Sequence, residues 1–350
     1  MRIEFEVILG WARWGAALSA LAYHVRFLLF VAYDSVASPG LLIKLFYFLS
    51  GLGHEAFAVF FVIEGIRAGA LLRRVEYGSF RAHVRRACTI SIPGLLVGML
   101  LDGAGVGFFN GSNLYGAYPD FTTVTLTVPS LVGNLFMLEP FIVPTFGSNS
   151  MLDLLSFLFW SPLLVAAYLS VGRAPALVAT LLRCVIALGV LLAAPPEFLV
   201  WMAIWVIGLT VHYAGERGRG ELALPAALAL FGAALLFSRL VGTGEPLVSP
   251  TIQHIFFYAK YALVGAGFAC FARACYARTA AQVRPIGIDA ESFVFFFHFP
   301  VMMLVAGIAA DVFSFPLKQQ PNTAAFAMFA LVVSICIGAG VLVARAMRPI

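Results

Sequence analysis

The chain has 350 residues, of which 62% are hydrophobic and 11% are charged, and its formal net charge is +5. Soluble globular domains contain about 45–50% apolar and about 25% charged residues, so one water-soluble core of this size does not accommodate the apolar excess. Lipid has to solvate much of it, and in lipid only helices or closed barrels satisfy the backbone. The apolar stretches are long and continuous rather than alternating, which favours helices. The composition therefore predicts an all-α, polytopic membrane protein, whose positive charge reflects basic loops and not nucleic-acid binding.

Ten stretches are candidates for membrane-spanning helices, each of which needs about 20 largely apolar residues. They are 8–32, 50–70, 87–106, 151–171, 175–193, 197–214, 221–240, 255–275, 289–310 and 323–345. Glycine, proline or charged residues interrupt several of them, which is tolerated where neighbouring helices shield the backbone. The sequence has no internal repeat and no low-complexity linker. Residues 1–350 are therefore predicted to form a single membrane domain of about ten transmembrane helices.

The placement of lysine and arginine predicts how these helices are oriented. Fifteen of the 22 basic residues lie in the segments on one side of the predicted membrane, and six of them fall between Arg67 and Arg86. Cytoplasmic loops carry an excess of Lys and Arg, so this side is predicted to be cytoplasmic, together with both chain termini.

The segment 104–150 is too long for an ordinary connection between two helices and contains no lysine or arginine. Its middle, LVGNLFMLEPFIVP, is apolar but too short to cross a membrane. Long ordered loops are often functional, so we expect either a re-entrant or interfacial element or an external cap over the helices.

Arg13 and His24 lie eleven residues apart in the first predicted helix. Eleven residues rise about 16 Å along a helix and bring the two side chains to within about 20° of the same face. Ionisable groups at membrane depth are costly and are functional candidates by default. Arginine can hold a phosphate or carboxylate, and histidine can exchange a proton near neutral pH. The alternative is an arginine that reaches the membrane surface and a histidine that packs between helices.

Two further features carry ionisable groups. His298, in ESFVFFFHFPVMML, is followed by Pro300, which would loosen the backbone there, so His298 could line a cavity or bond a neighbouring helix. The basic run that begins at Arg67 could bind anionic lipid headgroups or the phosphates of a soluble donor, or could only signal topology, and Glu64 could pair with Arg67 one turn away. The six histidines lack tight metal-ligand spacing, and no GxSxG, HExxH or phosphate-loop motif is present.

Six patterns follow one another along the chain: the Arg13-to-His24 spacing, GHEAFAVFFVIEGIRAGALLRR, FRAHVRRACTISIP, NLFMLEPFIVPTFGSNSML, SFVFFFHFPVMML and the terminal Arg348-Pro349. They resemble the motifs of the membrane acyltransferase family 3, bacterial O-acyltransferases that modify surface polysaccharides. Each pattern is short, but together they follow the family order and cover nearly the whole chain. The sequence departs from the family at Glu64, where the family usually has serine. It also has Asp153-Leu154-Leu155 for a Trp-Ser-Leu block, and Leu158 near the position of a family glutamate.

The resemblance implies a multi-pass protein of the bacterial inner membrane that moves an acyl group, most simply acetyl, from acyl-CoA to a carbohydrate hydroxyl. The acceptor would be a surface or exported glycan or a lipid-linked saccharide, and membrane lipids would surround the protein. His24 would act as general base or transient acyl carrier, and His298 would be a second residue of the site. Phosphates of the donor would be held by Arg13, Arg67, Arg73 and Arg74. No metal and no tightly bound cofactor is implied.

Two alternatives stay open. The first is a non-enzymatic transporter or flippase of a lipid-linked or small acidic substrate, or a degenerate family member, which the altered block at Asp153 favours. The second is a haem-binding helix bundle that uses His24 and His298.

Overall fold

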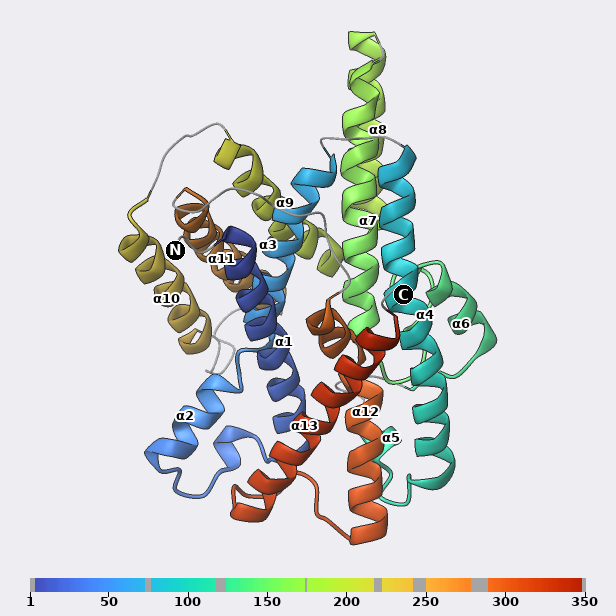
Figure 1. Ribbon diagram of the computed structural model, residues 1–350, viewed down its shortest axis with the longest axis vertical. Helices are drawn as coiled ribbons and strands as arrows, with labels where there is room; N and C mark the ends of the chain where they lie inside the picture. The colour runs from blue at the N-terminus through green and yellow to red at the C-terminus, as the bar shows by residue number, and fades with distance from the viewer. Residues whose placement is uncertain are drawn as a thin grey trace. The chain divides into compact units, whose positions relative to one another are not determined.

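The computed structural model describes residues 4–72, 77–117, 124–173, 175–216, 222–241, 250–277 and 289–347. Over these residues the protein is all-α (Figure 1), and its only β interactions are the isolated bridges Phe30–Gln319 and Thr125–Gly147. The all-α prediction is thereby confirmed. Each of the ten predicted stretches overlaps one long helix. These helices are α1 (Phe5–Leu29), α3 (Gly53–Leu72), α4 (Tyr77–Phe108), α7 (Met151–Ser170), α8 (Ala176–Ala193), α9 (Pro196–Glu216), α10 (Leu224–Leu240), α11 (Pro250–Tyr276), α12 (Ala290–Phe313) and α13 (Thr323–Ala346).

Seven helical stretches among the described residues are long and apolar enough to cross a membrane. They are Leu41–Gly69, Phe80–Phe108, Met151–Ser170, Ala176–Ala193, Pro196–Gly215, Ala290–Phe313 and Thr323–Ala346. Of the other long helices, α10 is apolar but has only 17 residues, and α1 carries Arg13, His24 and Arg26. Length and composition therefore support a multi-pass integral membrane protein.

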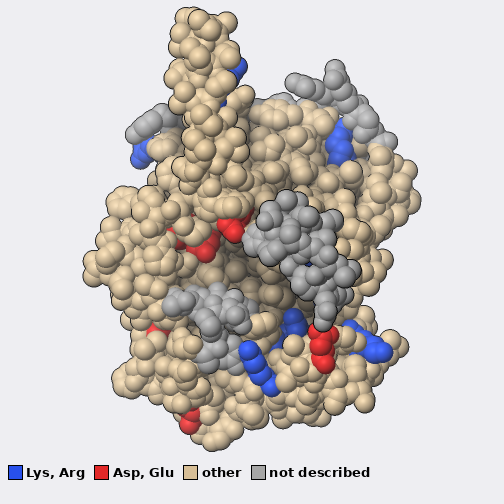
Figure 2. Space-filling view, turned by 180° about the vertical axis from the view of Figure 1, so that it is seen from behind, with Lys and Arg blue, Asp and Glu red and all other residues tan. Residues whose placement is uncertain are grey.

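The outer surface of the helices fits a lipid environment. Leu177, Leu188 and Leu192 of α8 are 74%, 57% and 78% exposed. On the face drawn in Figure 2, Lys, Arg, Asp and Glu are few, and wide areas without them lie between. Since exposed apolar surface on this scale is unfavourable in water, lipid is its natural solvent.

The chain divides into two compact units, each assembled from three separate parts of the sequence. Unit 1 comprises Met1–Arg13, Phe57–Val84 and Phe157–Gly287, and unit 2 comprises Trp14–Ala56, Arg85–Ser156 and Ile288–Ile350.

In unit 1, small residues let α3 and α9 approach closely. A Cβ added at Gly65 of α3 would collide with the backbone carbonyl of Trp205, and one added at Gly208 of α9 would collide with that of Val62. Glycines of this kind allow helix backbones to pack tightly where no hydrophobic force drives helices together in lipid. The helices α10 and α11 also pack against each other (Figure 1), as do α9 and α11. Close packing of α3 fixes the position of the charged residues that it carries.

In unit 2, α12 packs along α13 (Figure 1). At Gly340 of α13 an added Cβ would lie 2.8 Å from the backbone nitrogen of Val294 on α12, so the two backbones meet there. The helix α12 continues through Pro300 without interruption. The break that the sequence suggested at this proline does not form. Sixteen of its residues are buried, which places His298 in the interior of unit 2.

The described residues of the segment 104–150, which are 104–117 and 124–150, contain no helix long enough to span a membrane beyond the end of α4. After α4 ends at Phe108, it forms α5 (Leu114–Ala117) and α6 (Val128–Leu135). Its return to α4 is anchored at Asp102, whose carboxylate accepts hydrogen bonds from the backbone nitrogen and the hydroxyl of Ser148, both at 2.7 Å. Glu139 is fully buried in this segment. The alternatives of a re-entrant element and an external cap both remain compatible with this arrangement.

Candidate functional site

The two histidines singled out from the sequence meet in the interior of unit 2. His24 Nδ1 lies 2.9 Å from His298 Nε2, although 274 residues separate them along the chain. Their rings are stacked, with centroids 5.0 Å apart and an angle of 23° between the planes. Both side chains are almost inaccessible, at 4% for His24 and 1% for His298. The structure thus brings together the predicted base and the predicted second histidine, which we call the histidine pair.

The hydrogen bonds of the pair determine where its protons lie. His298 Nδ1 lies 3.0 Å from the carbonyl oxygen of Val294. A carbonyl only accepts, so Nδ1 of His298 carries the proton and, in the neutral ring, Nε2 offers a lone pair. His24 Nδ1 must then donate to that lone pair. Neutral His24 consequently carries its own lone pair on Nε2, the form that a general base requires.

Aromatic and sulfur-containing side chains enclose the pair. The Phe299 ring lies 4.6 Å from the His24 ring, and Tyr23 contacts it edge-on at 5.0 Å. Cys336 Sγ lies 3.7 Å from the carbonyl oxygen of His298. This setting keeps bulk water away from the imidazoles.

The haem alternative does not fit this geometry. Two nitrogens that ligate one iron from opposite sides are about 4 Å apart, given metal–nitrogen bonds of about 2 Å. At 2.9 Å the two histidines bond each other directly and leave no room for a metal between them. Among the described residues, no group of three or more His, Cys, Asp or Glu could hold a metal ion.

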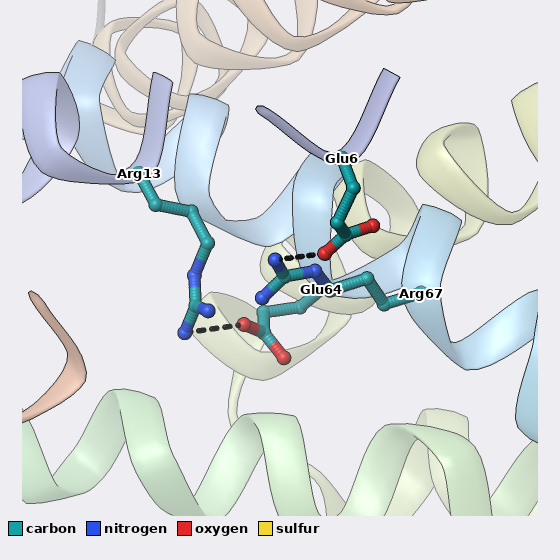
Figure 3. A network of polar contacts seen from close by, with 4 residues as sticks. All are labelled: Glu6, Arg13, Glu64 and Arg67. Carbon is teal, nitrogen blue, oxygen red and sulfur yellow. Dashed lines mark hydrogen bonds and ion pairs between the residues drawn. The ribbon is translucent and has the colours of Figure 1, made fainter. Parts of the chain in front are cut away.

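Unit 1 contains a second buried polar group, drawn in Figure 3, which we call the charge cluster: Glu6, Arg13, Glu64 and Arg67. Arg13 Nη2 lies 3.2 Å from Glu64 Oε1, and the Arg67 guanidinium pairs with the Glu6 carboxylate. The guanidinium of Arg13 also lies over the Phe60 ring, 5.2 Å from its centroid. The cluster joins two acids and two bases, so it is formally neutral, which suits a site of low dielectric.

The predicted donor-binding arginines are distributed as follows. Arg13 and Arg67 belong to the charge cluster, each paired with a carboxylate. Glu64 pairs with Arg13 of α1. The sequence had suggested Arg67, its neighbour one turn away on α3, as the partner of Glu64. Arg73 and Arg74 lie outside the described residues. The histidine pair and the charge cluster belong to different units. The helix α1 contributes His24 to the pair and both Glu6 and Arg13 to the cluster.

Glu6 is the member of the charge cluster that sequence reasoning missed. It precedes Arg13 by seven residues, which is two helical turns, so both side chains emerge on one face of α1. That spacing could have identified Glu6 as a residue on the same helix face as Arg13. Its partner Arg67, 61 residues away on another helix, was not readable from local spacing.

Comparison with known proteins found no match. None of the family models, curated proteins or solved structures compared with the chain matches it. Any function therefore has to be argued from the chain's own residues and their geometry.

Proposed function

We propose that this protein is a membrane-bound O-acyltransferase that moves an acyl group, most simply acetyl, from acyl-CoA to a hydroxyl of a surface or exported glycan. The observation that carries the proposal is the histidine pair, in which the hydrogen bonds leave the lone pair of His24 on Nε2. The ordered motifs that resemble membrane acyltransferase family 3 support the same reading, since they place both histidines at family positions.

In the proposed reaction His24 acts as the general base. Its Nε2 takes the proton of the acceptor hydroxyl while the hydroxyl oxygen attacks the thioester carbonyl of acyl-CoA. The carbon–sulfur bond breaks, and the departing thiolate takes the proton back from the imidazolium. The new ester stays on the glycan and free CoA leaves. His298 holds His24 in the required tautomer by accepting its Nδ1–H, as second-sphere partners do for other histidines.

The proposed setting is the bacterial inner membrane, crossed about ten times with both termini in the cytoplasm. The bias of fifteen basic residues toward one side supports this orientation. Acyl-CoA is cytosolic, so the donor would approach from the same side as the beginning of α1. Arg67, Arg73 and Arg74 are the proposed contacts for its phosphates. Arg13, which the sequence also suggested for this role, is paired with the buried Glu64 and is proposed to position α1.

A transporter or flippase of a small acidic or lipid-linked substrate is the second candidate. It is favoured by the charge cluster, because Arg13 and Arg67 are already paired with carboxylates. A histidine pair that passes one proton between its rings also suits proton-coupled transport.

The two candidates separate in a reconstituted system. Purified protein in lipid vesicles would receive acetyl-CoA labelled in the acetyl group, together with oligosaccharide acceptors. Acyltransfer predicts free CoA and labelled, alkali-labile ester on the acceptor in equal amounts. Substrate movement across the vesicle without release of CoA would instead establish the transporter.

A further inference from the structure

The charge cluster is built from two helices with complementary charge patterns. Along α1 the acid Glu6 comes before the base Arg13, and along α3 the acid Glu64 comes before the base Arg67. The ion pairs join the acid of each helix to the base of the other. Such pairing requires the two segments to run antiparallel, and it leaves each arginine with a carboxylate from the opposite helix (Figure 3).

The two ion pairs differ in how far they are from solvent. The side chains of Arg13 and Glu64 are 0% and 2% exposed, whereas those of Arg67 and Glu6 are 5% and 16% exposed. Breaking the deeper pair would leave a buried charge uncompensated, which is strongly unfavourable. In the outer pair the Glu6 side chain is 16% exposed, so Arg67 is the arginine whose carboxylate partner an incoming anion can replace most readily.

Glu6 is also the member that can move at least cost to the fold. It lies in the first turn of α1. Helix ends fray more readily than helix interiors, so the first turn is the part of α1 that can rearrange at least cost. A carboxylate and a phosphate each offer a guanidinium two oxygens in nearly the same geometry. Glu6 therefore occupies Arg67 in the manner of a phosphate.

We infer that Glu6 is an internal competitor that an anionic phosphate group displaces from Arg67, so that this carboxylate sets the affinity of the protein for its phosphate-bearing ligand. The inference deepens the proposed function and rests on it where the ligand is acyl-CoA. The same chemistry would accept the phosphate of a lipid headgroup. The Arg13–Glu64 pair stays closed in both states and holds α1 against α3.

The test measures binding of CoA and of inorganic pyrophosphate, without any transfer step, to the full-length protein in nanodiscs of neutral phosphatidylcholine. Glu6→Gln keeps the size of the side chain and removes the competing charge. It should tighten binding of both ligands by about tenfold or more, as expected for loss of a charge-assisted contact. Glu4→Gln is the matched control, since Glu4 is exposed near the same end of the chain, and it should leave both affinities unchanged. Adding Arg67→Gln to Glu6→Gln should abolish the gain.

Two further arms distinguish the source of the phosphate and the state of the protein. In nanodiscs with phosphatidylglycerol, a headgroup site predicts that the gain of Glu6→Gln for CoA disappears, while a site for a free donor predicts that it persists. Glu6→Ala, checked for unchanged thermal stability, should repeat the gain. Equal or weaker binding by both Glu6 variants, or no binding by any variant, overturns the inference. A gain in CoA binding without any acyl transfer would uphold it and count against the proposed function alone.

Discussion

His24 Nδ1 donates a hydrogen bond to His298 Nε2 across 2.9 Å, and His298 Nδ1 in turn donates to the carbonyl oxygen of Val294. These two hydrogen bonds set the tautomers of both rings. With the proton on Nδ1, the lone pair of neutral His24 lies on Nε2, the atom on which the proposed chemistry depends.

The role of His298 can be separated from that of His24 by two substitutions. His298→Leu removes the acceptor, so His24 loses the partner that selects its tautomer, and kcat should fall about tenfold or more with little change in KM for acyl-CoA. His298→Gln places an amide oxygen near the position of Nε2 and should restore part of kcat. Steady-state kinetics check this, and equal kcat for both variants and the parent would remove His298 from the mechanism.

The stability of the folded protein is predicted to depend on Arg13 and Glu64 being present together. Arg13→Met or Glu64→Met alone leaves one buried charge without its partner and should cost about 3–5 kcal/mol of stability. The double variant removes both charges and should recover most of that loss. Thermal unfolding in detergent measures the coupling, with Arg81→Met at an exposed position of α4 as a neutral control. Additive losses in the double variant would contradict a direct pair.

Glu139 should make stability depend on pH. Burial raises its pKa to about 9, against 4.5 for an ordinary glutamate, and nearby Asp153 adds to the shift. Between pH 4.5 and 9 the folded protein therefore keeps a proton that the unfolded chain has lost. The contribution of Glu139 to stability is fully present below pH 4.5 and decreases as the pH rises toward 9. The melting temperature of Glu139→Gln should fall less than that of the parent between pH 6 and pH 8. Parallel curves for the two proteins would contradict a buried, protonated Glu139.

The orientation of α4 tests the proposed topology. In a cysteine-free background, Phe80→Cys near the beginning of α4 should react with an impermeant thiol reagent only from the cytoplasmic side. Ser112→Cys, beyond the end of α4, should react only from outside. Both positions are exposed in the structure, so failure to label would not be due to burial. Labelling of position 80 in intact cells would reverse the orientation.

The long helices were predictable because membrane thickness sets a length of about 20 apolar residues, which the sequence displays directly. Helical periodicity predicted that Arg13 and His24 lie on one helix, and both residues are on α1. The partners of these residues could not be predicted from the sequence. His24 bonds a residue 274 positions away, and Arg67 bonds Glu6 across 61 positions, so only the packing of the helices reveals them. The path of 104–150 could not be predicted either, because the hydrogen bonds between Asp102 and Ser148 that hold it follow no periodic pattern in the sequence.

The central claim is that His24 acts as the base in acyl transfer, and the most direct measurement is the rate of ester formation by purified His24→Gln with acetyl-CoA and an oligosaccharide acceptor. Glutamine keeps hydrogen bonding and approximate size but takes up no proton near neutral pH. Transfer should fall by about 10²–10⁴-fold while CoA still binds. His83→Gln, a buried histidine outside the pair, should retain transfer. Near-parental transfer by His24→Gln would make His24 a packing residue and contradict the account.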